Sequence, residues 1–357
     1  MIRGCGRTTF RRYRSESGER FCGSAELIQE ILMRSSIKRF TRSTVGVISG
    51  SALLVLAGSS VVLISVGAGT GDSFADNEVP IFEPALDSSW RTDPIWYDGK
   101  AEYAVYDAVR PIYGNDRHYE AVLITNKQQM DPKTTTKSAD WRAPGQVEVF
   151  KHNLREVIPT ENYVYKFLTT AFVRTDDLTP FKVTMSSQED CGATFKHFVA
   201  DGKRVKADMF VYFPDGGPTH FEFAQNEGLQ FHDDLSLALR GYPFENAPKH
   251  PMTVSLVPDQ TNTHATSVEP IPTAVVFEGK ESLKLPIGTV EAYRLRVGSM
   301  GGSDNDSVIN GLDQSSSYWF AADGGPDWLH IMVKYEGPYR VKYELKSKKR
   351  WAYWKRN

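Results

Sequence analysis

Apolar and polar residues alternate along most of the chain after residue 97, and this alternation is its dominant signal. Apolar residues, many of them β-branched or aromatic, occupy most of the alternate positions in stretches such as 163–174, 181–187 and 205–213. Alternation with a period of two is typical of strands that bury one face. Turn residues separate several of these stretches: Asp201-Gly202, Pro286-Ile287-Gly288 and Gly337-Pro338. The pattern predicts a mainly β fold, built as an antiparallel sheet, a sandwich or an open barrel.

The clearest local signal is a hairpin. Residues 282–285 and 290–297 read as strands on either side of Pro286-Ile287-Gly288-Thr289. Proline fixes φ near −65° at the second turn position, and Gly288 accepts a positive φ that strains other residues. We therefore expect residues 282–297 to form two antiparallel strands around a tight turn.

Helical patterning is confined to two short stretches. Residues 234–240 follow Asp233, a candidate N-cap, and precede Gly241, a stop signal. Residues 151–157 are so few that a strand remains an alternative. Strands and helices do not alternate along the chain, so a parallel α/β sheet is not expected. We expect one or two short helices against the sheet.

Residues 45–68 form an apolar run without a single charge, and four basic residues lie between positions 34 and 42. A basic segment followed by an apolar one is the layout of a secretory signal or of an N-terminal membrane anchor, with the basic side in the cytoplasm. The sequence therefore predicts a cytoplasmic basic segment at 1–44. It also predicts that the rest of the chain is exported across the cytoplasmic membrane.

Two fates of the apolar run stay open. Its length is sufficient to span a bilayer and exceeds the core of most signal peptides, which favours a transmembrane helix. Ser73-Phe74-Ala75 nevertheless offers small residues at both recognition positions of a signal-peptide cleavage site. The exported domain is periplasmic after cleavage, and membrane-anchored without it. Met33 is an alternative start, in which case residues 1–32 are not translated.

Composition supports a folded, exported body. With 40% hydrophobic and 24% charged residues, the chain has the material for a sizeable core. Proline and polar residues dominate 69–96, which we interpret as a linker, so the mainly β domain spans 97–357. The body has more acidic than basic residues, which argues against a nucleic-acid partner. Cys191 is the only cysteine after residue 22, so the body has neither an internal disulfide nor a zinc site of several thiolates.

Several segments of the body carry a resemblance to a known family. They are residues 233–239 (DDLSLAL), 276–294 (VFEGKESLKLPIGTVEAYR), 318–323 (YWFAAD) and 328–333 (WLHIMV). Over about residues 147–347 the chain resembles a family of bacterial exported β-proteins that is catalogued only as a domain of unknown function. The resemblance implies an exported, mostly antiparallel β domain, and it supplies no catalytic residues.

Motifs with defined chemistry are missing from the sequence. It contains no nucleophile elbow, phosphate loop or dinucleotide fingerprint, so no catalytic residue is assigned and no cofactor is expected. His220, Glu222 and His232 are candidate metal ligands, since residues 220 and 222 of a strand point to the same face. In the alternative interpretation, His220 and Glu222 lie on the solvated face of a strand whose Phe221 and Phe223 point inward.

Aromatic and basic residues are interleaved near residue 350. Trp351, Tyr353 and Trp354 follow Lys349 and Arg350, and this combination suits an anionic surface such as lipid headgroups or an envelope polymer. In the alternative interpretation, a final strand packs its aromatic residues inward while its basic residues protect an open edge from pairing.

The sequence thus favours an exported cell-envelope protein with a binding or structural role. The membrane is a partner through residues 45–68 if this segment is not cleaved. The alternative is an envelope hydrolase whose site is assembled from dispersed His, Asp and Glu residues. A deep pocket that gathers histidine and acidic side chains favours the hydrolase, whereas a shallow concave face lined with aromatic residues favours binding.

Export is tested with reporters fused after Asn357. The basic cluster ahead of residues 45–68 predicts that a reporter active only in an oxidising compartment is active at this position, and that a cytoplasm-only reporter is silent. Activity of the cytoplasm-only reporter in the same fusion would contradict the assignment.

Overall fold

The computed structural model describes residues 85–355, apart from 215, 300–307, 310, 311, 314 and 323–328. The predicted signal or anchor segment, 45–68, lies outside the described residues. Among the residues that are described, there is no helix with the length and apolar character that a bilayer span needs. The described chain is mainly β, as the alternation predicts.

Strands account for most of the described elements. Their bounds are β1 Ala101–Ile112, β2 Asn115–Asp131, β3 Thr136–Lys137, β4 Val147–Pro159, β5 Val164–Arg174, β6 Pro180–Glu189, β7 Gly192–Ala200, β8 Arg204–Val211, β9 Gly217–Ala224, β10 Leu229–Phe231, β11 Met252–Val257, β12 Ile271–Leu285, β13 Gly288–Ser299, β14 Val308–Ile309, β15 Leu312–Asp313, β16 Ser316–Ala321, β17 Met332–Glu336 and β18 Lys342–Trp351.

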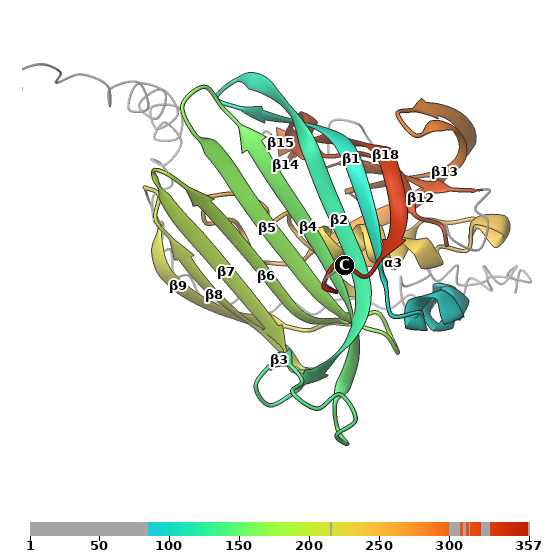
Figure 1. Ribbon diagram of the computed structural model, residues 1–357, viewed down its shortest axis with the longest axis horizontal. Coiled ribbons are helices and arrows are strands. Elements are labelled where there is room, and N and C mark those ends of the chain that lie inside the picture. The colour runs from blue at the N-terminus through green and yellow to red at the C-terminus, as the bar shows by residue number, and fades with distance from the viewer. Residues whose placement is uncertain are drawn as a thin grey trace, which may run out of the picture. The chain divides into compact units, whose positions relative to one another are not determined.

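One large, open sheet contains all of these strands except the small pair β14–β15 (Figure 1). Its order is β10-β11-β12-β13-β16-β17-β18-β1-β2-β4-β5-β6-β7-β8-β9, and β3 pairs with β2. Neighbouring strands are antiparallel, apart from the parallel pair β10–β11. Alternation decides which face is inward: in β8, Val205, Ala207 and Met209 are buried while the residues between them are not.

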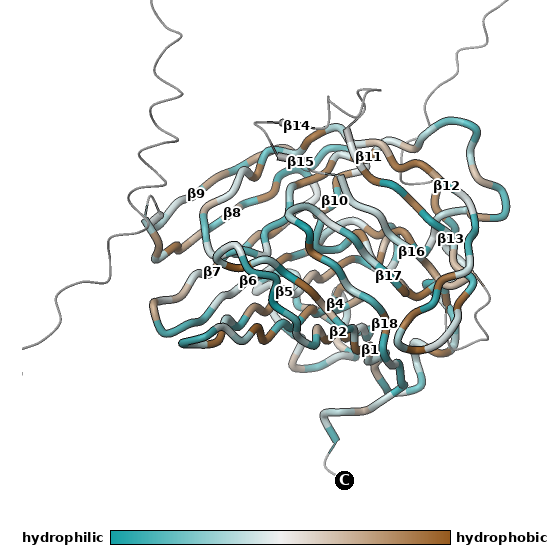
Figure 2. Tube along the Cα trace, turned by 90° about the horizontal axis from the view of Figure 1, so that it is seen from above, coloured by the Kyte–Doolittle hydropathy of each residue, from teal (hydrophilic) through white to brown (hydrophobic). Residues whose placement is uncertain are grey.

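The sheet curls along its length, so that strands far apart in its order share one core (Figure 2). The rings of Phe198 in β7 and Phe231 in β10 are in contact, with their centroids 5.1 Å apart, although these two strands lie near opposite ends of the strand order. Two 3-10 helices, Ser89–Thr92 and Pro94–Tyr97, add Trp90 and Trp96 to the same core. The last residues of the predicted linker are therefore packed against the domain.

The predicted hairpin is confirmed. β12 and β13 pair antiparallel down to Leu285 opposite Gly288, which leaves Pro286 and Ile287 as the turn. Gly288 has a φ of +125°, the positive value for which a glycine is needed. The turn is shorter than the four residues expected from the sequence, because pairing continues to the last position on both strands.

The predicted helix lies in a short segment after β10. It consists of a 3-10 turn (His232–Asp234), the helix α3 (Leu235–Ala238) and a second 3-10 turn (Leu239–Gly241). The predicted helix over 234–240 is confirmed, but Asp233 does not cap it: its carboxylate accepts hydrogen bonds from a neighbouring loop instead. Residues 151–157, the other helical candidate, belong to strand β4.

Strand β18 lies in the interior of the sheet. It pairs with β17 on one side and with β1 on the other, where Ala101 lies opposite Trp351. Pairing with β17 ends at Glu344, so in the described part of the chain Lys349 and Arg350 pair with β1 on one side only. The interpretation of these two residues as guards of an open edge therefore stays a prediction.

Candidate functional site

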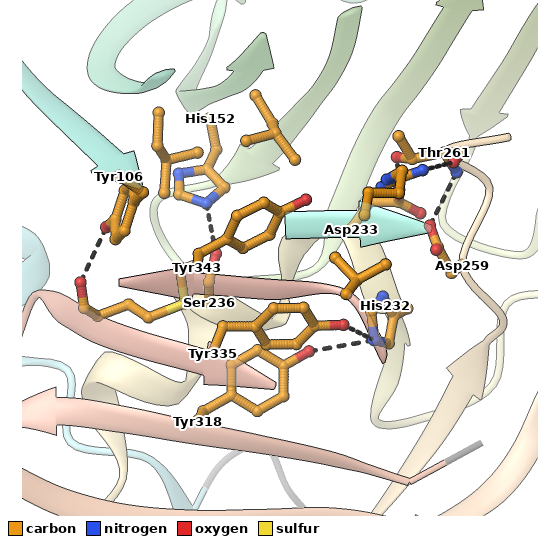
Figure 3. Close-up of a pocket in the computed structure, with 15 residues that line it drawn as sticks. Tyr106, His152, His232, Asp233, Ser236, Asp259, Thr261, Tyr318, Tyr335 and Tyr343 are labelled. Atoms are coloured by element: carbon orange, nitrogen blue, oxygen red, sulfur yellow. Dashed lines mark hydrogen bonds between the residues drawn. The ribbon is translucent and has the colours of Figure 1, made fainter. Parts of the chain in front are cut away.

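A cavity of about 60 Å³ lies between the inner face of the sheet and the helical segment (Figure 3). Space of this size holds several water-sized groups. We call it the tyrosine cavity. Its lining comes from β1, β2, β4, β16, β17, β18, the helical segment and the loop after β11. It consists of Tyr106, Arg110, Leu123, His152, Leu154, His232, Asp233, Ser236, Asp259, Thr261, Tyr318, Met332, Tyr335, Val341 and Tyr343.

Helical spacing presents polar residues to the cavity and apolar residues to the core. His232, Asp233 and Ser236 are separated by one, three and four positions, so they share one side of the turn. All three line the cavity and are half-buried. Leu235 and Leu239 recur with the same spacing on another side and are fully buried. Core packing therefore fixes the direction in which the polar side chains point.

Two carboxylates of the cavity share one loop residue. Asp233 accepts hydrogen bonds from the Thr261 hydroxyl (2.8 Å) and from the Gln260 amide (3.2 Å), while Asp259 accepts one from the Thr261 amide (2.8 Å). Burial, and then the charge of Asp259, raise the pKa of Asp233 to about 7. Near neutral pH Asp233 is therefore partly protonated, so the pair is able both to donate and to accept a hydrogen bond.

The Asp259 carboxylate stays ionised. Burial acts to raise its pKa, but the charge of Arg110, and that of His232 when its ring is protonated, outweigh burial, and the net pKa is lowered. Burial also lowers the pKa of His232, so that its imidazole is neutral at neutral pH. Arg110 is then the permanent charge that keeps Asp259 in its carboxylate form.

His232 is surrounded by hydroxyl groups. The hydroxyls of Tyr335 and Tyr318 lie 3.1 and 3.3 Å from its Nε2 (Figure 3). The Ser316 hydroxyl also lies 3.1 Å from this nitrogen. Burial raises the pKa of both tyrosines well above the ordinary value, so they remain protonated. A neutral Nε2 accepts from such hydroxyls, and the ring edges of the tyrosines form an aromatic wall.

An ion pair closes the next part of the wall. Nη2 of Arg110 lies 3.2 Å from Oε2 of the fully buried Glu156, and its Nη1 donates to the Thr261 carbonyl at 2.8 Å. Glu156 also accepts hydrogen bonds from the hydroxyls of Tyr119 and Tyr343. Buried charges are tolerated only when they are paired and hydrogen-bonded, as both are here.

A serine and a histidine meet at the opposite part of the cavity. The Ser236 hydroxyl lies 2.7 Å from Nε2 of His152, whose Nδ1 lies 2.8 Å from the Thr125 hydroxyl. This is the linear order of nucleophile, base and orienting group found in many hydrolases. Burial, and then the nearby charge of Arg240, lower the pKa of His152 to about 3, so the ring is neutral and only weakly basic.

Lys196 holds the loop that carries Asp259 and Thr261. The lysine is fully buried, and its Nζ donates to the Gln260 carbonyl and to the Asn262 side chain, both at 3.0 Å. Burial lowers its pKa to about 8. Because its three donors face loop acceptors, Lys196 positions the loop from behind the cavity.

The three metal candidates are not brought together. His220 and Glu222 are exposed on β9, where His220 contacts Asp208 (2.6 Å) and Glu222 pairs with Arg204 (3.0 Å). His232 lies in the tyrosine cavity. In the described part of the chain, no group of three or more His, Cys, Asp or Glu side chains has a metal-binding arrangement.

The aromatic and basic residues near position 350 divide into two roles. Trp351, Tyr353 and Trp354 are 37–50% exposed, and Nζ of Lys349 lies 4.0 Å from the centroid of the Trp351 ring. Arg350 instead pairs with Asp98 at 2.8 Å and donates to the Ile95 carbonyl. Four of the candidate surface residues are therefore accessible, whereas Arg350 ties the last strand to the first helical turns.

Sequence patterns did not identify most of the residues that line the cavity. Arg110, His152 and Tyr335 lie on three different strands and Asp259 lies in the loop after β11. Because these positions are distant in sequence, no local motif contains them. The one available signal was the polar stripe of the short helix.

Comparisons with protein-family models, with curated proteins and with solved structures give no match for this chain.

The raised pKa of Asp233 predicts a pH-dependent contribution to stability. Its pKa of about 7 in the folded state exceeds the ordinary value of 3.8, so folding favours the protonated form. The contribution is complete below about pH 4 and is lost as the pH rises through about 7. Asp233→Asn removes this loss. As the pH rises from about 4 to above 7, the free energy of unfolding of the variant should therefore increase relative to that of the wild type.

Urea unfolding at a series of pH values measures the difference, with the exposed Asp107→Asn as the control that should follow the wild type. If the free energies of unfolding of Asp233→Asn and the wild type differ by the same amount at every pH from about 4 to about 8, Asp233 does not have a raised pKa.

Proposed function

We propose that the chain is an exported cell-envelope protein that binds a small, neutral, hydroxyl-bearing ligand in the tyrosine cavity. The observation that carries this proposal is the cavity itself, in which charged and hydrogen-bonding side chains from separate elements face a space of about 60 Å³. Interior polar groups are costly to bury. Their concentration around a space is therefore better explained by a ligand than by stability.

The chemistry of the lining points to hydroxyl groups. Asp233 and Asp259 offer carboxylate oxygens, Ser236 a hydroxyl, and Tyr318 and Tyr335 the aromatic surface on which a C–H face packs. A cationic ligand is disfavoured because Arg110 already lies in the wall. An anionic ligand is disfavoured because acceptors predominate. A cavity of this size takes one end of a small polyol or sugar.

Cellular location belongs to the same proposal. The apolar segment 45–68, the basic residues before it and the resemblance over 147–347 to exported β-proteins support a domain outside the cytoplasm. The exposed Trp351, Tyr353 and Trp354 beside Lys349 support contact between this domain and a lipid or polymer surface of the envelope.

Binding is tested by thermal denaturation of the protein with glycerol, a hexose and an N-acetylhexosamine. At a ligand concentration ten times its Kd, the melting temperature should rise by about 2–5 °C. The rise should vanish in Asp259→Asn, which keeps the shape of the side chain, and persist in the exposed Asp107→Asn. Unchanged melting with all three compounds at millimolar concentration would contradict the proposal.

Hydrolysis is the second candidate function, and the 2.7 Å contact between Ser236 and His152 favours it. Nε2 accepts the proton as the Ser236 oxygen attacks, and Thr125 holds the other ring nitrogen. Proton transfer from Ser236 to His152 is less favourable than in a triad with a carboxylate. The group beside Nδ1 is the neutral Thr125 hydroxyl, which provides no negative charge to stabilise the imidazolium that forms. This is why binding is the first candidate.

A fluorophosphonate probe separates the two candidates. An activated serine displaces fluoride from the probe, so a hydrolase should be labelled at Ser236, and His152→Gln should slow labelling by about 100-fold or more. Ser186→Ala, on the outer face of β6, is the control and should label normally. An unlabelled Ser236 in the folded wild type would exclude a serine hydrolase and leave the binding function.

A further inference from the structure

The strand β9 (Gly217–Ala224) ends the sheet and leaves one edge open. In the part of the chain that the structure describes, β9 pairs with β8 and with no other strand, and it lies at the rim of the sheet in Figures 1 and 2. At the other end of the sheet, all three residues of β10 are buried. An open edge presents a row of unpaired backbone groups that can pair with another strand.

The hydrogen-bond register shows which residues present these groups. The Gln225 amide donates to the Lys203 carbonyl at 2.9 Å, and the register between β8 and β9 has no irregularity. Antiparallel pairing alternates with a period of two, so the odd-numbered residues of β9 bond to β8. The backbone groups of His220, Glu222 and Ala224, together with the Pro218 carbonyl, therefore point to the open edge.

Side chains of β9 are self-complementary around Phe221. In an antiparallel pair of two identical strands with a twofold axis at this residue, His220 of each copy lies opposite Glu222 of the other, and the two Phe221 side chains meet. Phe221 is 41% exposed, so its ring has apolar surface to bury.

Charges on the outer face extend this complementarity. His220 already contacts Asp208, and Glu222 already pairs with Arg204. Pairing of two copies places these groups in an alternating row, with Arg204 and Glu222 of one copy next to His220 and Asp208 of the other. Like charges do not face each other in this register. A twofold axis at residue 220 or at residue 222 would instead place two His220 or two Glu222 side chains opposite each other.

We propose that β9 is a homodimerisation strand, and that two copies of the protein join their sheets antiparallel in the register centred on Phe221. The pairing forms about six backbone hydrogen bonds: each His220 and Glu222 pair exchanges two, and each Pro218 carbonyl accepts one from Ala224. The missing N–H of Pro218 removes one bond at each end of the interface. It leaves the centre intact.

Register-specific cross-linking tests the proposal on the full chain with Cys5, Cys22 and Cys191 replaced by serine. Residue 221 faces its own copy in a non-hydrogen-bonded pair, whose Cα atoms are about 4.5 Å apart, within the range that a disulfide spans. Phe221→Cys should therefore give a disulfide-linked dimer that reductant dissolves. Thr219→Cys is the matched control, because the two copies of residue 219 are about 13 Å apart and should not link.

Glu222→Pro tests the edge itself. It removes an outward N–H without touching the bonds to β8, so light scattering should give the mass of one chain, whereas Glu222→Gln should keep the mass of two. If Glu222→Pro does not fold, the cross-linking result decides.

Three results would overturn the proposal. The first is a monomeric wild type at every concentration. The second is a dimer that links through residue 219 but not 221, or that persists in a folded Glu222→Pro variant. The third is an adduct at residue 221 with a different protein, which would show that the edge receives another partner.

Discussion

The fold depends on filling the inside of a sheet that curls but does not close. A sheet with one apolar face must cover that face, and in this chain a segment of ten residues, 232–241, does much of the covering. Leu235, Leu237 and Leu239 are fully buried there. Arg240 adds a buried ion pair with Glu102 of β1, with 2.5 Å between the charged atoms. The segment thereby ties the helical turn to the strand at the middle of the sheet.

The same segment places polar side chains in the interior, and this explains the unusual chemistry of the cavity. A turn that is anchored on one side by leucines presents His232, Asp233 and Ser236 on the other side, toward tyrosines of β16 and β17 and the ion pair of Arg110. Each of these groups has partners, which keeps the cost of burial low. Space nevertheless remains between them, and this space gives the arrangement its capacity to bind.

Local patterns predicted the fold far better than the site. Alternation identified the strands, and Pro286 with Gly288 identified the hairpin, because both signals lie within a few residues. The helix was also predicted, but the role of Asp233 was not: its partner Thr261 is nearly thirty positions away. His232 was grouped with His220 on residue type alone, although strand β9 and the helical segment face different surroundings. The curl of the sheet brings together residues that are far apart in the sequence, so the spacing of residues along the chain does not predict these contacts.

The pairing of the first strand with the last has a consequence for folding kinetics. Ala101 of β1 lies opposite Trp351 of β18, so the centre of the sheet is a contact between residues about 250 positions apart. Contacts of this sequence separation form late, since the closure entropy of the intervening chain opposes them. During synthesis, β1 has only β2 as a paired strand until β18 emerges. The domain consequently stays incompletely folded until almost its whole length has left the ribosome, and its central strands remain unpaired on one side for most of that time.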